Sequence, residues 1–197
     1  KHMNLYFCIQ SMYTSTSDYH THHTSTKKWS PIEFAIVLHM YDPGRCDRLD
    51  ASLMKAAYWP SATVDYGGFK GEAHVFADLV MGALAGQYQL TQHRVTNTVF
   101  EFLSDQQAAT ESLVFAKHLL LDGSSEMVFS GRYLDRFECE GSNWKFKFRR
   151  VVMDWSRRRD VVDERAEGSF AALTKGLNNQ QDASWHHLAS ASVAMVE

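Results

Sequence analysis

The chain has 197 residues, 45% hydrophobic and 13% aromatic, which is enough for one domain with its own core and some excess at the ends. A net charge of −3 and a pI near 6.4 exclude a general basic surface, so we expect no nucleic-acid partner. No apolar run reaches the roughly 18 residues of a membrane-spanning helix, so we expect no membrane partner.

The cysteines show no metal-binding pattern. Cys8, Cys46 and Cys139 are odd in number and widely spaced, and they form no CxxC motif. This usage is typical of a reducing compartment, so we expect a cytoplasmic protein. We also expect neither a metal nor a cofactor.

The two ends of the chain differ from its middle. Residues 1–28 resemble a tag or a disordered arm, because their histidines lie among Ser and Thr with nothing rigid to hold a metal. We predict one domain at residues 29–156. A C-terminal extension follows at residues 157–197, where the sequence becomes first charged and then rich in Ala and Ser.

Helical signals dominate the first part of the domain. Ser30 and Pro31 are suited to begin a helix whose apolar stripe ends at Tyr41. A second, short helix is expected from about Asp50, stopping before Trp59-Pro60. A strand at residues 62–66 and a glycine turn then lead to a third helix at residues 71–85.

Four longer strands follow, joined largely by hairpins, at residues 90–103, 108–121, 126–138 and 144–155. The fourth is expected to have one packed face and one wet or interfacial face. The evidence is an alternation of apolar and basic residues: Trp144, Phe146 and Phe148 against Lys145, Lys147 and Arg149.

Helices first and an antiparallel sheet after them predict an α+β fold. We expect N-terminal helices packed in a strongly curved, mainly antiparallel sheet. Such a sheet leaves a hollow at its open end, and small ligands bind in hollows of this kind.

Five motifs resemble the SnoaL-like family of the nuclear transport factor 2-like superfamily, whose fold is an α+β cone. They are DRLD at 47–50, YWPSATVDYG at 58–67, TQHRVTN at 91–97, GRYLDRFE at 131–138 and RRVVMDW at 149–155. Within the family the sequence is most similar to a group that includes hexachlorocyclohexane dehydrochlorinase, bile-acid dehydratase and scytalone dehydratase.

This resemblance implies a cofactor-independent lyase that removes water or HCl from a small hydrophobic molecule. The family's aspartate and histidine match Asp47 and His93, and a pocket tyrosine matches Tyr66. A second pocket tyrosine of the family lies five residues before the aspartate, and the corresponding residue here is Tyr41, six residues before Asp47. The resemblance therefore implies a His93–Asp47 general-base pair, with Tyr66 as a third catalytic residue.

The residue types suit that chemistry. A neutral imidazole accepts a proton near pH 7, and a carboxylate at its other nitrogen fixes the tautomer. Tyr66 or Tyr58 could donate a hydrogen bond to a carbonyl or leaving oxygen. Apolar walls are expected from Trp59, Phe69, Phe115, Phe129 and Tyr133.

Other interpretations stay open. Taken alone, a histidine on a strand is usually structural, and His118 is expected to be structural although it could be a second acid-base group. An isomerase or polyketide-type cyclase would use the same base in the same pocket. A non-catalytic ligand-binding or assembly module is a third possibility, because this fold hosts enzymes and non-enzymes.

We also expect a homo-oligomer. The outer sheet face would carry a mixed row suited to a partly polar subunit contact. Its members are Arg132, Leu134, Arg136, Lys145, Lys147, Arg149 and Val151. The resemblance favours a trimer over a dimer.

Overall fold

A computed structural model describes residues 46–141, 143–185 and 187. The arm at residues 1–28, the first predicted helix and Tyr41 lie outside this part of the chain. The described elements are η1 (Cys46–Arg48), α3 (Ala51–Ala57), β1 (Tyr58–Asp65), β2 (Lys70–Glu72), α4 (Ala73–Gln87), β3 (Tyr88–Ser104), β4 (Gln107–Leu120), β5 (Ser125–Glu140), β6 (Asn143–Asp160) and η2 (Gly168–Ala172).

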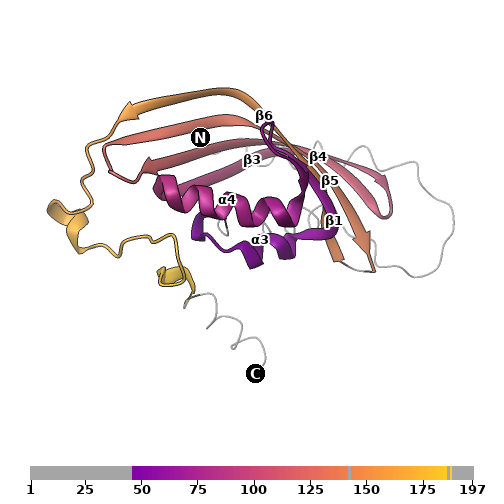
Figure 1. Cartoon of the computed structure of the whole chain (residues 1–197), viewed down its shortest axis with the longest axis horizontal. Helices are drawn as coiled ribbons and strands as arrows, with labels where there is room; N and C mark the ends of the chain where they lie inside the picture. The colour runs from indigo at the N-terminus through magenta and orange to yellow at the C-terminus, as the bar shows by residue number, and fades with distance from the viewer. Residues whose placement is uncertain (1–45, 142, 186, 188–197) are drawn as a thin grey trace, which may run out of the picture.

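The strands form one six-stranded sheet in the order β2-β1-β6-β5-β4-β3. Only the β1–β6 pair is parallel among the described strands. The sheet curves around α3 and α4, which lie in its concave side (Figure 1). The predicted α+β cone is therefore confirmed, as are the four long strands.

Local signals explain where the helices begin and what they bury. The Asp50 side chain accepts a hydrogen bond from the Leu53 N–H at 2.9 Å and so caps α3. Helix α4 buries one stripe against the sheet, formed by Phe76, Ala77, Met81 and Leu84. Burying such a stripe is what stabilises a helix of this length.

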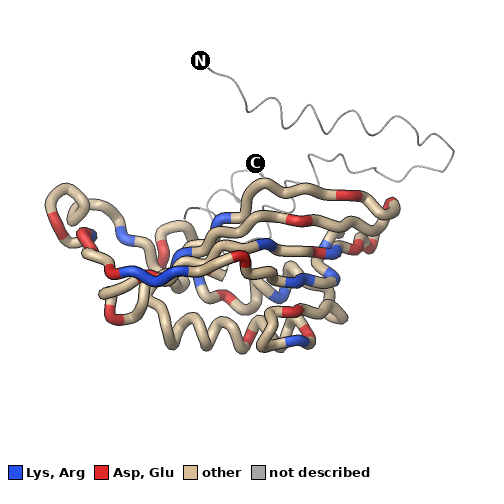
Figure 2. The backbone as a smooth tube through the Cα atoms, turned by 90° about the horizontal axis from the view of Figure 1, so that it is seen from above, with Lys and Arg blue, Asp and Glu red and all other residues tan. Residues whose placement is uncertain are grey.

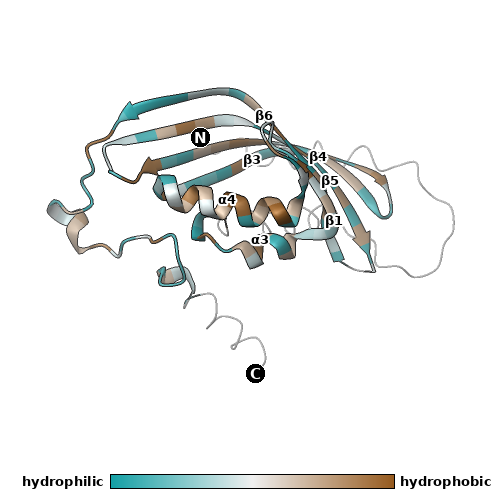
Figure 3. Cartoon of the chain, viewed as in Figure 1, coloured by the Kyte–Doolittle hydropathy of each residue, from teal (hydrophilic) through white to brown (hydrophobic). Residues whose placement is uncertain are grey.

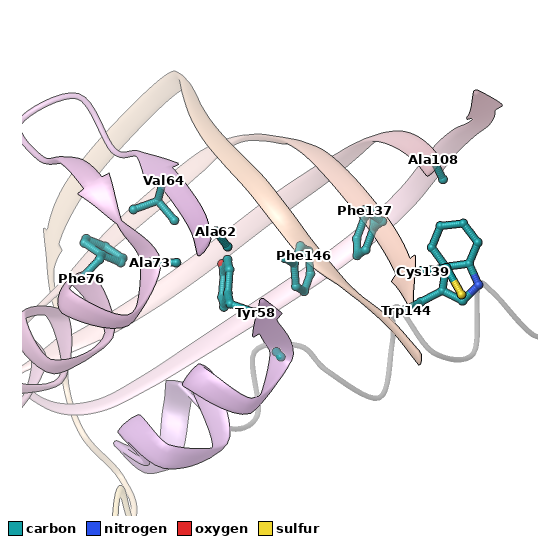
Figure 4. Packing of buried hydrophobic residues seen from close by; sticks show 11 residues of the cluster. Tyr58, Ala62, Val64, Ala73, Phe76, Ala108, Phe137, Cys139, Trp144 and Phe146 are labelled. Atoms are coloured by element: carbon teal, nitrogen blue, oxygen red, sulfur yellow. The ribbon is translucent and has the colours of Figure 1, made fainter. Parts of the chain in front are cut away.

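The core lies between β1, β5, β6 and the start of α4. Tyr58 stacks on Phe146 with ring centroids 5.0 Å apart, and Phe137 approaches the same ring at 4.4 Å. Figure 4 shows these rings in a row along the sheet, with Trp144 and Cys139 farther along the row. Hydropathy alternates along the strands, as expected when only one face is packed (Figure 3).

The predicted alternation in β6 is wrong beyond Phe146. The pairing register shifts at this point, because Arg136 pairs with Phe148 whereas Phe137 pairs with Phe146. One extra residue, Lys147, sits in the bulge and reverses which face the following residues occupy. Arg149, expected on the outer face, is therefore buried with only 7% exposure. Strand β6 also runs to Asp160, past the boundary predicted at residue 156.

A second register shift, at Gly131, gives a stability test. A Cβ atom at this position would lie 2.1 Å from the Val152 carbonyl oxygen and 2.7 Å from the Phe129 ring. Gly131→Ala should therefore lower the free energy of unfolding by about 1–3 kcal/mol in urea titration, since backbone must move. Gly82→Ala is the matched control, because a Cβ there meets nothing. This variant should be neutral or stabilising by up to about 1 kcal/mol. Equal stabilities for the two variants would contradict the close packing at Gly131.

Candidate functional site

Asp47 is presented by the short turn η1, and its carboxylate is hydrogen-bonded by residues of β3. Its Oδ1 atom accepts a hydrogen bond from Thr91 Oγ1 at 2.7 Å, and its Oδ2 atom accepts one from the His93 N–H at 3.0 Å. Leu49, with φ of 54°, then turns the chain away toward α3. The carboxylate is 5% exposed, so these bonds replace the water that burial removes.

The His93 ring completes this arrangement. Its Nδ1 atom lies 2.7 Å from Asp47 Oδ1. An ionised carboxylate can only accept, so the neutral ring carries its proton on Nδ1 and has its lone pair on Nε2. Burial raises the pKa of Asp47, but the hydrogen bonds and charge of His93 outweigh it and leave the pKa below its ordinary value. Asp47 is therefore a carboxylate at neutral pH.

His93 opens onto a cavity of about 250 Å³ in the concave side of the sheet. The lining is largely apolar and aromatic, with a few polar groups from different strands. Of the predicted site residues, Tyr58, Tyr66, His93, Phe129 and Tyr133 line this cavity. Such a combination, a mostly apolar pocket with a few convergent polar groups, is typical of a small-molecule site.

Two further polar side chains in the cavity have shifted pKa values. Burial raises the pKa of Tyr66 to about 12, although the charge of Arg149 opposes this, so the phenol stays protonated and can donate. Its ring stacks on Phe76 at 4.0 Å. Burial and the neighbouring His93 lower the pKa of His118 to about 4. The His118 ring lies 5.3 Å from the His93 ring, edge to face, and is neutral at physiological pH.

Arg149 is the polar lining residue that the sequence reasoning missed. Its guanidinium makes two hydrogen bonds of 2.8 Å to the Asp135 carboxylate on β5. It also lies over the Tyr133 ring, 4.0 Å from the centroid. Burial would lower the pKa of Arg149, but Asp135 raises it well above its ordinary value. Burial raises the pKa of Asp135, and the bidentate contact with a permanent cation keeps it ionised.

Three predicted wall residues do not line the cavity. The Trp59 indole N–H donates to the Glu138 carbonyl at 2.9 Å, and Phe69 packs on Phe76 at 5.3 Å. Phe115 lies on the sheet face opposite Ala116, which does line it, because successive strand residues alternate.

A second, larger cleft of about 790 Å³ borders the same pair from another side. It lies between β3, η1 and the chain that follows β6. Asp47 and His93 line it together with apolar residues of the extension, including Phe170, Leu173 and Leu177. His93 thus separates two cavities.

The described residues contain neither a metal-binding cluster nor a membrane-spanning helix. No group of three or more His, Cys, Asp or Glu side chains is placed to hold a metal ion. No helix among these residues has the length and apolar character needed to cross a bilayer.

Comparison with known proteins now decides the family. Residues 43–150, more than half of the chain, match the model of the SnoaL-like domain. This chain belongs to the SnoaL-like family. No curated protein matches the SnoaL-like chain in sequence.

Solved structures agree with the fold of this family. The chain is similar to a scytalone dehydratase-like protein from Novosphingobium aromaticivorans, with 19% identity and a TM-score of 0.57 over 63% of this chain and 83% of that one. Hexachlorocyclohexane dehydrochlorinase LinA-type3 from Novosphingobium barchaimii gives 19% identity and a TM-score of 0.57 over 64% and 87%. A type 2 form of that dehydrochlorinase gives 20% and 0.57 over 65% and 86%. At these identities the likeness shows the fold alone.

The buried ion pair in the cavity gives a second stability test. Asp135→Asn would leave Arg149 buried without its counter-charge, which should cost about 3–5 kcal/mol of unfolding free energy. Asp154→Asn is a matched control. Asp154 on β6 forms an ion pair of 3.1 Å with Arg132 on β5, so it joins the same two strands, but this pair is on the exposed face. Urea unfolding should show a much smaller loss for this control. A similar loss of unfolding free energy in both variants would mean that burial does not make the Asp135–Arg149 pair more important for stability than an exposed pair.

Proposed function

We propose that this SnoaL-like protein is a cofactor-independent lyase that removes water or a hydrogen halide from a small hydrophobic molecule. The observation that carries the proposal is the Asp47–His93 contact of 2.7 Å, with His93 opening onto an apolar cavity. Elimination of this kind needs a base beside an acidic C–H bond and a donor near the leaving group.

His93 is proposed as the base. With the ring proton held on Nδ1 by Asp47, the Nε2 lone pair is available to take a proton from carbon. Asp47 then faces the positive charge that forms on the ring, and its carboxylate stabilises that imidazolium. The buried position of Asp47 strengthens this interaction, because little water screens it.

Tyr66 and Arg149 are proposed as the groups that receive the leaving group or a substrate carbonyl. As the C–H bond breaks, its electron pair forms the new double bond and the leaving group departs with its own bonding pair. A departing hydroxide takes a proton from the protonated Tyr66 phenol and leaves as water. A halide needs no proton and is stabilised by the Arg149 charge. One scytalone dehydratase-like protein and a hexachlorocyclohexane dehydrochlorinase among the structural neighbours support this reaction class.

Loss of the base tests the proposal. On a panel of β-hydroxycarbonyl and halogenated cyclic substrates, His93→Ala should reduce kcat/KM by about 10²–10⁴-fold, since a general base supplies roughly that factor. His74→Gln is the matched histidine control, because His74 lies on α4 outside the cavity lining, and it should keep wild-type turnover. Unchanged turnover in His93→Ala would remove the proposed base.

The mass of the product separates this reaction from the second candidate. An isomerase or polyketide-type cyclase would use the same base and the same donors but would conserve the substrate mass. A dehydratase product is lighter by one water. Tight binding of panel compounds without any conversion would instead favour a non-catalytic ligand-binding or assembly module.

We also propose that the protein assembles as a homotrimer through the outer sheet face. This face carries exposed apolar side chains on three strands, with Val99 69%, Leu113 44% and Trp155 47% exposed. Basic and acidic residues are distributed along the strands of the sheet (Figure 2). A mixed, partly apolar surface of this kind is costly to leave in water and suits a subunit contact.

Light scattering on tag-free protein measures the assembly directly. The expected mass is three times the 22.5 kDa of one chain. Trp155→Lys should shift the population toward monomer, because it places a charge in the apolar part of the proposed contact. A wild-type mass of one chain would contradict assembly altogether, and a mass of two chains would contradict the trimer.

A further inference from the structure

Asp47 depends on a turn that has few contacts of its own. Turn η1 is three residues long, and the Leu49 N–H closes it by donating a hydrogen bond to the Cys46 carbonyl at 3.0 Å. The carboxylate must nevertheless stay within hydrogen-bond distance of His93 Nδ1. The next residue, Arg48, contacts a different part of the chain.

The partner of Arg48 lies in the C-terminal extension, beyond the family match at residues 43–150. Arg48 Nε is 3.2 Å from Asp182 Oδ1, an ion pair without an aligned hydrogen bond. The two side chains are 31% and 7% exposed. In Figure 1 the extension leaves the end of β6, coloured orange, and returns in yellow to the region of η1.

Asp182 is held rigidly before it meets Arg48. Its carboxylate accepts hydrogen bonds from the Leu177 N–H at 2.8 Å, the Ser184 N–H at 3.0 Å and the Ser184 hydroxyl at 2.5 Å. These donors hold the pKa of Asp182 well below its usual range, so it carries a full negative charge. A buried carboxylate fixed in this way can orient a flexible arginine.

The extension is attached to the sheet at two other places. The Val161 N–H donates to the Ser124 carbonyl at 2.9 Å, in the turn between β4 and β5. Arg165 Nη2 donates to Gln89 Oε1 at 3.0 Å, near the start of β3. Residues 161–182 therefore bridge β3, which carries His93, and η1, which carries Asp47, and several of them line the larger cleft.

We propose that Asp182 is a positioning residue of the site: through Arg48 it fixes η1 so that the Asp47 carboxylate faces His93. The C-terminal extension is then part of the functional unit and not an appendage. This inference rests on the proposed function for its effect on turnover. Its effect on the Asp47–His93 contact is independent of any reaction.

Four variants and one control test the inference in the full chain. Asp182→Asn and Arg48→Gln each remove one charge of the pair, and the double variant removes both. Arg48→Lys keeps the positive charge. Glu167→Gln removes an exposed carboxylate from the same extension, outside the lining of the cleft, and serves as the control.

The first readout is the tautomer of His93 by ¹⁵N NMR with labelled histidine. In the wild type the ring should carry its proton on Nδ1. Asp182→Asn and Arg48→Gln should reduce this population, because the Asp47 carboxylate is no longer held against the ring. Arg48→Lys should keep most of this population, and Glu167→Gln should leave it unchanged.

The second readout is turnover. Displacements of about 1 Å can cost up to roughly 10²-fold in rate, so kcat should fall by about tenfold in Asp182→Asn with little change in KM. The double variant should fall no further than either single variant, because the two residues act as one unit.

These readouts separate failure of the inference from failure of the proposed function. A wild type without turnover on the panel, together with a changed His93 tautomer in Asp182→Asn, would reject the function and support the positioning role. A folded Asp182→Asn variant with the wild-type tautomer and kcat would overturn the positioning role. If Asp182→Asn loses its fold by circular dichroism, Arg48→Gln decides, since it leaves the Asp182 turn intact.

Discussion

The placement of one buried carboxylate governs the site. Asp47 is 5% exposed, and the hydroxyl, amide and imidazole donors that satisfy it all come from β3. A buried charge is tolerated only when it is paired and hydrogen-bonded, so η1 and β3 can be joined in only a narrow range of ways. The same contacts decide which nitrogen of His93 carries the proton. The fold and the chemistry thus share a single set of hydrogen bonds.

A second buried charge lies across the cavity and has a different origin. The bulge at Lys147 turns Arg149 inward, where Asp135 on the neighbouring strand meets it with two bonds of 2.8 Å. Without that extra residue the Arg149 side chain would lie on the outer face of the sheet, in solvent. A local irregularity of one residue therefore changes a surface cation into a polar group inside an apolar pocket.

The sequence was sufficient for the fold and for the pairing of Asp47 with His93, since hairpin turns and family motifs are read directly from residues. It could not reveal that Arg149 is buried, because the residues before Arg149 alternate regularly and a bulge has no reliable signal in one sequence. The sequence also could not show which aromatic residues face the cavity and which face the other side of the sheet. Phe115 and Phe129 both lie on long strands, and only the register shows which face each occupies. The contact between Asp182 and Arg48 could not be predicted, because the two residues lie far apart in the chain.

Strand order explains why the proposed base and the proposed donors are kept apart. His93 is on β3 at one edge of the sheet, whereas Arg149 is on β6, with β4 and β5 between them. Three strand spacings of about 4.8 Å would place them roughly 14 Å apart on a flat sheet, and curvature brings them across one cavity. The parallel β1–β6 pair then sets Tyr66 beside Arg149. A substrate between them would meet the base at one end and the donors at the other, so proton removal and departure of the leaving group would occur on different sides of the molecule.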